Sequence, residues 1–82
     1  MHKITNSKIF ITGGAGFIGS YVVEELLKYH PARIVILDNL IRGSVANMAA
    51  FINHPAVEFI EGDIRDTALL ERGIRGADFV FH

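Results

Sequence analysis

The sequence predicts an α/β protein built on a doubly wound parallel sheet, with the element order βαβαβαβ. Short apolar runs alternate along the chain with segments of helical periodicity. The run at residues 33–38 is apolar without alternation, which is typical of a strand buried on both faces of a parallel sheet. Because connections between parallel strands are right-handed in nearly all proteins, this order places helices on both faces of the sheet.

The strands are expected at residues 8–12, 33–38, 57–61 and 77–82. The last of these resembles a buried strand that stops without a turn. We therefore expect the 82-residue chain to be cut inside a fold and to be the N-terminal part of a larger domain. A naturally short protein that ends on an edge strand is the alternative.

The first helix is expected from Phe17 to Tyr29. Ile18, Val22 and Leu26 recur at every fourth position, so the sequence predicts that their face packs on the sheet. Pro31 ends this segment, because the residue before a proline is disfavoured in the helical conformation.

Two further helices are expected, and each has a residue that can cap its N-terminus. A short, weaker helix is predicted from Val45 to Ile52, with Ser44 as its N-cap. A third helix is predicted from Thr67 to about Arg72, with Asp66 in the same role.

The segment between the first strand and the first helix is rich in glycine. Gly14, Gly16 and Gly19 fit the spacing G-x-G-x-x-G, and Gly13 with the last two fits G-x-x-G-x-x-G. Glycine allows a tight turn and a close approach of the backbone to a pyrophosphate, which the N-terminus of the helix then attracts. No lysine follows Gly19, so a nucleoside-triphosphate-hydrolysing loop is disfavoured. The sequence therefore predicts a Rossmann-like dinucleotide site, the alternative being a turn that only packs helix against sheet.

Asp38 ends the second strand, 19 positions beyond Gly19. A carboxylate there can accept hydrogen bonds from the ribose hydroxyls of NAD, and it repels the 2′-phosphate of NADP. NAD is therefore expected in preference to NADP, although Arg33 and Arg42 could pair with a phosphate. A strand-end carboxylate that only caps a loop is the alternative.

Asp63 and Ile64 follow the third strand, on the edge of the sheet where ligands bind in such folds. The carboxylate could accept a hydrogen bond from the adenine amino group, and the backbone of Ile64 could pair with the ring. The alternative is that Asp63 only forms a turn after Gly62.

Composition excludes several other classes of function. The formal net charge is −1 and no basic run exists, so nucleic acid is not an expected partner. No apolar stretch approaches the ~20 residues that cross a bilayer, and the N-terminus lacks a signal peptide, so we expect no membrane association and a cytoplasmic location. There is no cysteine and the four histidines are scattered, so no metal site is expected. His82 is expected to have a structural role.

Together these segments resemble the N-terminal part of extended short-chain dehydrogenases/reductases, and more narrowly the NAD-dependent sugar-nucleotide epimerases and dehydratases. The resemblance covers essentially the whole chain, with its motifs in the family's order. It is carried by Thr12 to Ser20, Asp38 to Leu40 with Arg42 and Gly43, Glu61 to Asp66, and Ala77 to His82.

The resemblance implies which residues hold the pyrophosphate of the cofactor. Gly13, Gly16, Phe17 and Ile18 would line the turn, and Gly19 would lie where the helix packs closely on the sheet. No catalytic residue is expected in this chain, since the family's Ser/Thr and Tyr-x-x-x-Lys lie beyond the region present here, as does the domain that binds the nucleotide sugar.

The resemblance also implies the adenosine contacts. Asp38 and Asn39 would hold the ribose, with the loop of Arg42 and Gly43 beside them. Asp63 and Ile64 would contact adenine.

The activity that the resemblance implies for the intact protein is hydride transfer between a nucleotide sugar and NAD, at C4 of the sugar, through a keto intermediate. The chain alone would then be inactive, and a homodimer is one expected assembly. Two alternatives stay open, namely a non-catalytic regulatory module that binds NAD(P) and an extended short-chain dehydrogenase acting on a non-sugar substrate.

Overall fold

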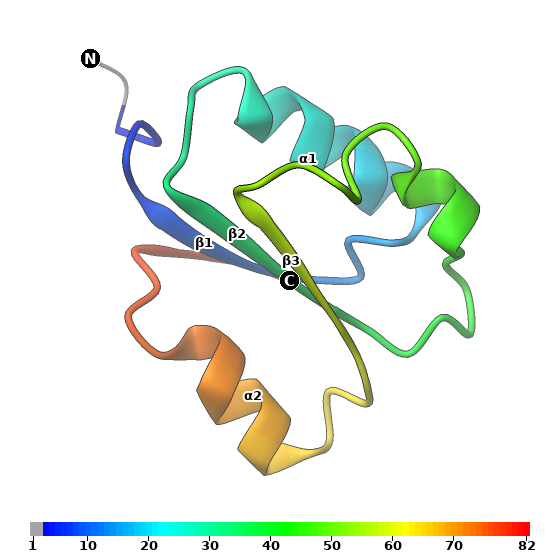
Figure 1. Cartoon of the computed structure of the whole chain (residues 1–82). Helices are drawn as coiled ribbons and strands as arrows, with labels where there is room; N and C mark the ends of the chain where they lie inside the picture. The colour runs from blue at the N-terminus through cyan, green and yellow to red at the C-terminus, as the bar shows by residue number, and fades with distance from the viewer. Residues whose placement is uncertain (1–2) are drawn as a thin grey trace.

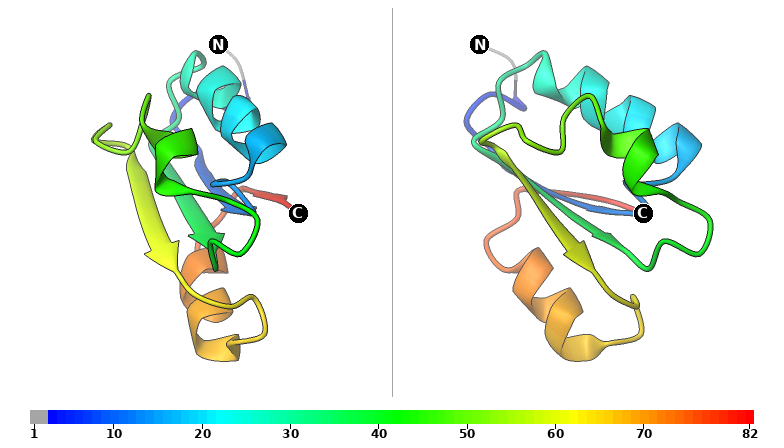
Figure 2. Two further views of the ribbon diagram at one scale, coloured as in Figure 1. Left: turned by 90° about the vertical axis from the view of Figure 1, so that its right-hand side faces the viewer. Right: turned by 45° about the vertical axis from the view of Figure 1, so that its right-hand side comes forward.

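The computed structural model describes residues 3–82 and shows one parallel sheet between two helical layers (Figure 1). Its four strands lie in the order β3-β2-β1-β4. The α-helix α1 and the 3₁₀-helix η1 cover one face, and the α-helix α2 covers the other (Figure 2). The elements are β1 (Lys8–Thr12), α1 (Phe17–Leu27), β2 (Arg33–Asp38), η1 (Val45–Met48), β3 (Val57–Glu61), α2 (Thr67–Ile74) and β4 (Phe79–Phe81). The predicted α/β class and element order are confirmed.

The register of the strands brings their carboxyl ends to one edge of the sheet. Thr12 of β1 pairs with Leu37 of β2, and Asp38 of β2 pairs with Glu61 of β3. The loops that follow β1, β2 and β3 therefore leave the sheet side by side. Ligands bind at this edge in open parallel sheets.

The core consists of two apolar clusters, one on each face of the sheet. Ile9, Ile11, Ile34 and Ile36 point toward α1 and η1. Their neighbours in sequence point the other way, so that Phe10, Val35, Leu37 and Ile60 form a smaller cluster beneath α2. The unbroken apolar run of β2 is thus buried on both faces, as its sequence predicted.

The predicted buried face of α1 was wrong. Ile18 is 78% exposed, whereas Ser20, Val23 and Leu26 are buried. Hydrophobicity alone missed the small residues at the start of the helix, which lie against the turn and let the two backbones meet closely. The helix also ends at Leu27 rather than Tyr29, and His30 adopts a positive φ of 56° where the chain reverses.

The ends of the shorter elements also differ from expectation. The 3₁₀-helix η1 stops at Met48 rather than Ile52, although Ser44 caps it as predicted by accepting from the amide of Asn47. Asp66 likewise caps α2. That helix continues to Ile74, because Gly73 packs so tightly on the ring of Phe10 that any Cβ would collide with it.

β4 is shorter than expected and is more exposed than its apolar sequence suggested. Val80 is 54% exposed and Phe81 is 37% exposed. β4 forms the edge of the described sheet and pairs only with β1, so one side of it has no neighbouring strand. The expectation that residues 77–82 form a buried strand is therefore wrong for the described structure.

Candidate functional site

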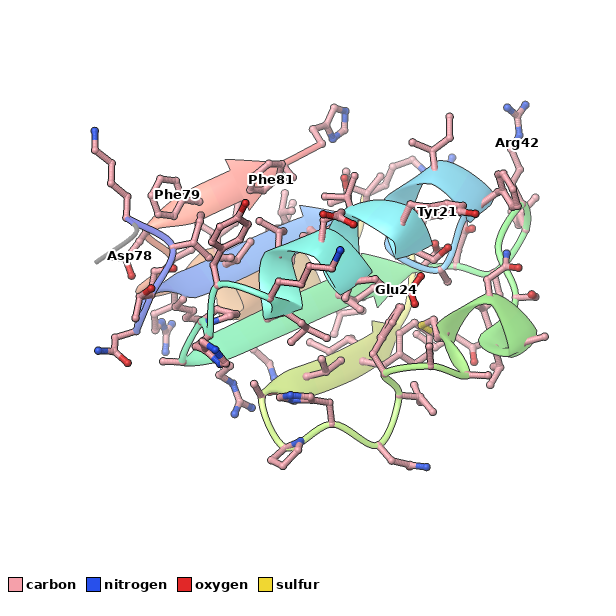
Figure 3. All side chains as sticks on the ribbon, turned by 90° about the horizontal axis from the view of Figure 1, so that it is seen from above. Tyr21, Glu24, Arg42, Asp78, Phe79 and Phe81 are labelled. Carbon is pink, nitrogen blue, oxygen red and sulfur yellow. The ribbon has the colours of Figure 1, made fainter. Side chains whose placement is uncertain are left out.

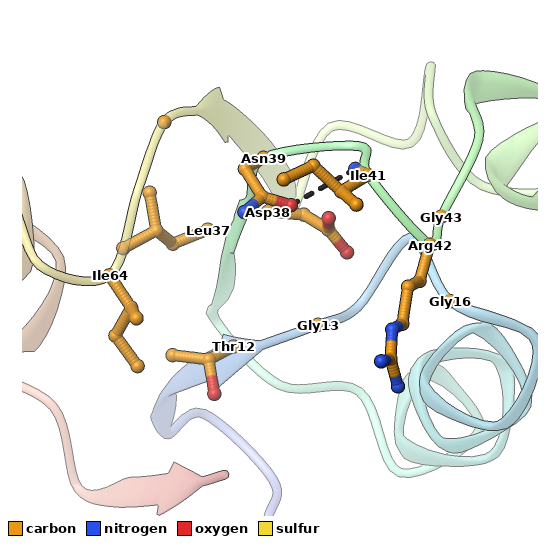
Figure 4. Close-up of a pocket in the computed structure, with 11 residues that line it drawn as sticks. Thr12, Gly13, Gly16, Leu37, Asp38, Asn39, Ile41, Arg42, Gly43 and Ile64 are labelled. Atoms are coloured by element: carbon orange, nitrogen blue, oxygen red, sulfur yellow. Dashed lines mark hydrogen bonds between the residues drawn. The ribbon is translucent and has the colours of Figure 1, made fainter.

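A cavity of about 490 Å³ opens at the carboxyl edge of the sheet (Figure 4). The loops after β1, β2 and β3 all contribute to its wall, as the register of the strands requires. Its lining consists of Thr12, Gly13, Gly16, Leu37, Asp38, Asn39, Ile41, Arg42, Gly43, Gly62 and Ile64. Asp38 and Arg42 are the charged residues in that wall.

The glycine turn forms one side of this cavity. Gly13 has a φ of +75°, a conformation that L side chains rarely adopt, and its amide donates to the carbonyl of Leu37. The amide of Gly16 then donates back to the carbonyl of Gly13 at 3.0 Å. Gly16 is the N-cap of α1, and no side chain of the described residues caps that end of the helix or places an acidic group in its first turn. The positive end of the helix dipole is therefore uncompensated beside the cavity.

α1 approaches the turn closely at Gly19. A Cβ at this position would overlap the carbonyl oxygen of Gly13 and come within 3.0 Å of its carbonyl carbon. The neighbouring atoms are backbone, so they cannot move aside as a flexible side chain could. Gly19 thus lies against the turn itself rather than against the sheet.

Asp38 has two roles at the end of β2. Its side chain is nearly buried, and one carboxylate oxygen accepts from the amide of Ala15 at 3.1 Å. The other oxygen accepts from the amide of Leu40 at 2.8 Å. A carboxylate has about four acceptor positions, so these two bonds leave capacity for a ligand. Asp38 therefore caps the loop and still faces the cavity.

The loop after β2 continues this pattern. Asn39 accepts from the amide of Ile41 through its side-chain oxygen at 3.0 Å. Arg42 is exposed, and its side chain lies beside the N-terminal end of α1 in two views (Figure 3 and Figure 4). Gly43 packs on Ala15, and a Cβ there would come within 2.7 Å of the Ala15 carbonyl. The loop is thus folded back onto the glycine turn.

Asp63 and Ile64 are placed differently from one another. Ile64 lines the cavity, but Asp63 does not. The Asp63 carboxylate forms an ion pair with Arg65 at 2.7 Å and accepts from its backbone amide at 2.8 Å. The hydrogen bond from the Arg65 side chain is the main reason that the pKa of Asp63 falls to about 2. The side chain of Asp63 therefore holds its own turn, the alternative that its sequence position left open.

The other predicted residues lie outside this cavity. Ile18 and Gly19 line a second hollow of about 210 Å³, which shares Thr12 and Gly13 with the first and reaches His82. Phe17 lines neither hollow. It is 72% exposed, and its ring meets Tyr21 edge to face with the centroids 5.5 Å apart.

Sequence reasoning missed several residues of the lining. Leu37 and Gly62 lie at strand ends, where the register alone brings them to the cavity, and Ile41 stands in the loop after β2. Thr12 borders both hollows, and its hydroxyl lies 3.0 Å from the ring nitrogen Nδ1 of His82. Its position directly before Gly13 was the available signal.

Neither a metal site nor a membrane span emerges from the described part of the chain. Among residues 3–82, no group of three histidine, aspartate or glutamate side chains could hold a metal ion, and His2 lies outside these residues. No helix within the same range is long and apolar enough to cross a bilayer.

Comparison with known proteins gives one consistent result. Residues 9–82 match the model of the NAD dependent epimerase/dehydratase family. UDP-glucuronic acid decarboxylase 3 of Arabidopsis thaliana is 38% identical over 77 residues, which cover 94% of this chain and 21% of the relative. UDP-glucose 4-epimerase of Pasteurella multocida is 47% identical over 66 residues, which cover 78% of this chain and 19% of the relative.

A solved structure gives the same result for the fold. The Bordetella bronchiseptica enzyme WbmF, crystallised in complex with NAD+, superposes with a TM-score of 0.88 at 38% sequence identity. The superposition covers 99% of this chain and 24% of that one. The chain thus spans about a fifth to a quarter of the length of the relatives it matches.

Proposed function

The chain belongs to the NAD dependent epimerase/dehydratase family, and on this premise we propose that it is the NAD-binding portion of a nucleotide-sugar epimerase or dehydratase. The observation that carries the proposal is the convergence of three features on one cavity: the glycine turn at an uncapped helix N-terminus, the carboxylate of Asp38 and the guanidinium of Arg42. The relatives support the sugar part of the proposal, since their names specify UDP-sugars.

The residues present fit an adenine dinucleotide. The turn has no side chain that would keep a phosphate away, because Gly13 and Gly16 line the cavity and Gly19 admits no Cβ. Free helical amides and the dipole at the start of α1 would bind the pyrophosphate. NAD, when bound, supplies a hydride acceptor that can return the hydride. The chain's own residues supply binding, orientation and charge.

The adenosine half is assigned to the loops after β2 and β3. Asp38 would accept from the ribose hydroxyls with its remaining lone pairs, and Asn39 orders the loop beside it. Ile41 and Ile64 offer apolar walls for the adenine ring. Because Arg65 occupies the carboxylate of Asp63, we assign the ring contact to Ile64 and the backbone, rather than to the Asp63 side chain.

The test of the proposal is calorimetric titration of the intact protein with NAD and with NADP, followed by turnover assays with UDP-sugars. Binding of NAD in preference to NADP and conversion of a UDP-sugar are the expected results. Absence of heat with either dinucleotide would refute the proposal. NAD binding without turnover of any sugar would favour the regulatory module, and turnover of a non-sugar alcohol would favour the other alternative. A Tyr-x-x-x-Lys motif downstream of His82 is expected under both enzymatic readings. A cytoplasmic location and a homodimer stay predictions.

Arg42 gives a prediction about charge. Replacing it by glutamine (Arg42→Gln) should weaken NAD binding about two- to fivefold, the usual worth of one solvent-screened ion pair. The dependence of the dissociation constant on salt should also flatten, because a screened attraction is lost. Arg75→Gln is the matched control, since it removes the same charge after α2, away from the cavity. Equal salt dependence in both variants and the wild type would remove Arg42 from the phosphate site.

A further inference from the structure

Ala15 connects the two halves of the candidate site. It is fully buried between the glycine turn and the loop after β2. Its amide donates to Asp38 at 3.1 Å, and its carbonyl accepts from the amide of Ser44 at 3.1 Å. The same carbonyl accepts a second bond at 3.0 Å from the side-chain amide of Asn47. Both polar groups of one buried residue are therefore held by the segment that follows β2.

Asn47 is the side chain in this connection that no role has yet claimed. It belongs to η1, it is half-buried, and it lines neither hollow. Its backbone amide already bonds to Ser44, which caps η1. Its side-chain amide is therefore not needed for the cap, and it reaches across 32 positions of sequence to Ala15.

The bond from Asn47 fixes the orientation of a particular peptide group. The carbonyl of Ala15 and the amide of Gly16 belong to one rigid, planar unit, so holding the carbonyl also holds the amide. Gly16 is the N-cap of α1, and its amide donates to the carbonyl of Gly13. The direction of this unit sets how the turn presents its amides and the start of α1 to the cavity.

From this geometry we infer that Asn47 is a positioning residue for the dinucleotide. It orients the pyrophosphate turn through Ala15 without touching the ligand, and it couples the turn to the loop that carries Asp38. The inference rests on the proposed function, because its effect is felt only when a dinucleotide binds. Preorganisation of this kind lowers the cost of ordering the site on binding.

The test replaces Asn47 by aspartate (Asn47→Asp) in the intact protein and measures NAD binding by calorimetry. The variant keeps the size of the side chain but sets a carboxylate oxygen against the Ala15 carbonyl in place of a donor. The dissociation constant for NAD should rise about tenfold, which corresponds to ~1.4 kcal/mol. Asn47→Ala, which removes the donor without adding charge, should give a smaller rise in the same direction, and it decides the question if the aspartate variant fails to fold.

Asn53→Asp is the matched control. It makes the same chemical change on an exposed side chain beyond η1, and its NAD affinity should stay within about twofold of the wild type. ADP and adenosine separate positioning from general destabilisation. ADP binding should weaken as NAD binding does, whereas adenosine, which has no pyrophosphate, should be little affected. Wild-type affinity for NAD in both Asn47 variants, or an equal loss for ADP and adenosine, would overturn the inference. Failure of the wild type itself to bind NAD would instead refute the proposed function.

Discussion

Gly19→Ala is expected to abolish measurable NAD binding and to destabilise the fold. Alanine normally favours a helix interior over glycine by about 1 kcal/mol, so helix propensity alone predicts a more stable protein. The structure reverses this sign, because the new Cβ would overlap the carbonyl oxygen of Gly13, a backbone atom of the turn. Overpacking of this kind typically costs ~1–3 kcal/mol. The free energy of unfolding, measured with denaturant, should fall by that amount.

The loss of binding follows from where the strain is relieved. Either α1 moves away from the sheet or the turn after β1 changes shape, and both displace the amides that would meet the pyrophosphate. We expect the dissociation constant for NAD to rise at least about 100-fold, or ~2.7 kcal/mol. Gly16→Ala is the graded comparison, since its Cβ would lie 3.2 Å from the same oxygen and a small shift accommodates it. A Gly19→Ala protein that bound NAD as tightly as the Gly16→Ala protein would contradict the close-approach argument.

The strands were the most predictable part of this fold. β1, β2 and β3 begin and end at the expected residues, because burial on a parallel sheet demands a continuous apolar run that composition alone reveals. The buried face of α1 could not be found in the same way. Ser20 is buried because small residues permit close approach, while Ile18 stands beyond the sheet edge and is exposed. Hydrophobic periodicity ranks these two residues in the opposite order.

The candidate site was predictable in outline but not in its connections. The spacing of the glycines and of Asp38 identified the cavity, because both must lie at the carboxyl ends of neighbouring strands. The sequence gave no sign that Arg65 would occupy the carboxylate of Asp63, or that Asn47 would bond to Ala15. Such bonds depend on the path of a loop, which local propensities leave undetermined.

Asp38→Asn is expected to weaken NAD binding strongly and to change the preference between dinucleotides. The amide of asparagine has one oxygen where the carboxylate has two, so it cannot accept from both Ala15 and Leu40 as Asp38 does. One buried amide is left without its partner, at a cost of about 1–3 kcal/mol in the free energy of unfolding. The glycine turn and the loop after β2 would thus lose part of their connection.

Binding should suffer for a second reason. The carboxylate would accept from the ribose hydroxyls as a charged group, and charge-assisted hydrogen bonds are roughly twice as strong as neutral ones. We expect the dissociation constant for NAD to rise about 30- to 100-fold, or ~2–2.7 kcal/mol. NADP binding should change far less, because removal of the negative charge also removes its repulsion of the 2′-phosphate. The ratio of the two dissociation constants, measured by calorimetry, is the deciding quantity.

Glu61→Gln provides the matched control for Asp38→Asn. Glu61 pairs with Asp38 in the strand register, yet it is exposed and lines neither hollow. The same charge is therefore removed at the neighbouring strand end, and both dinucleotides should bind nearly as they do to the wild type. If the two variants shifted the NAD-to-NADP ratio equally, the preference would come from the general field of the sheet edge. A shift confined to Asp38→Asn would assign it to a direct contact, since only Asp38 has free acceptor positions facing the cavity.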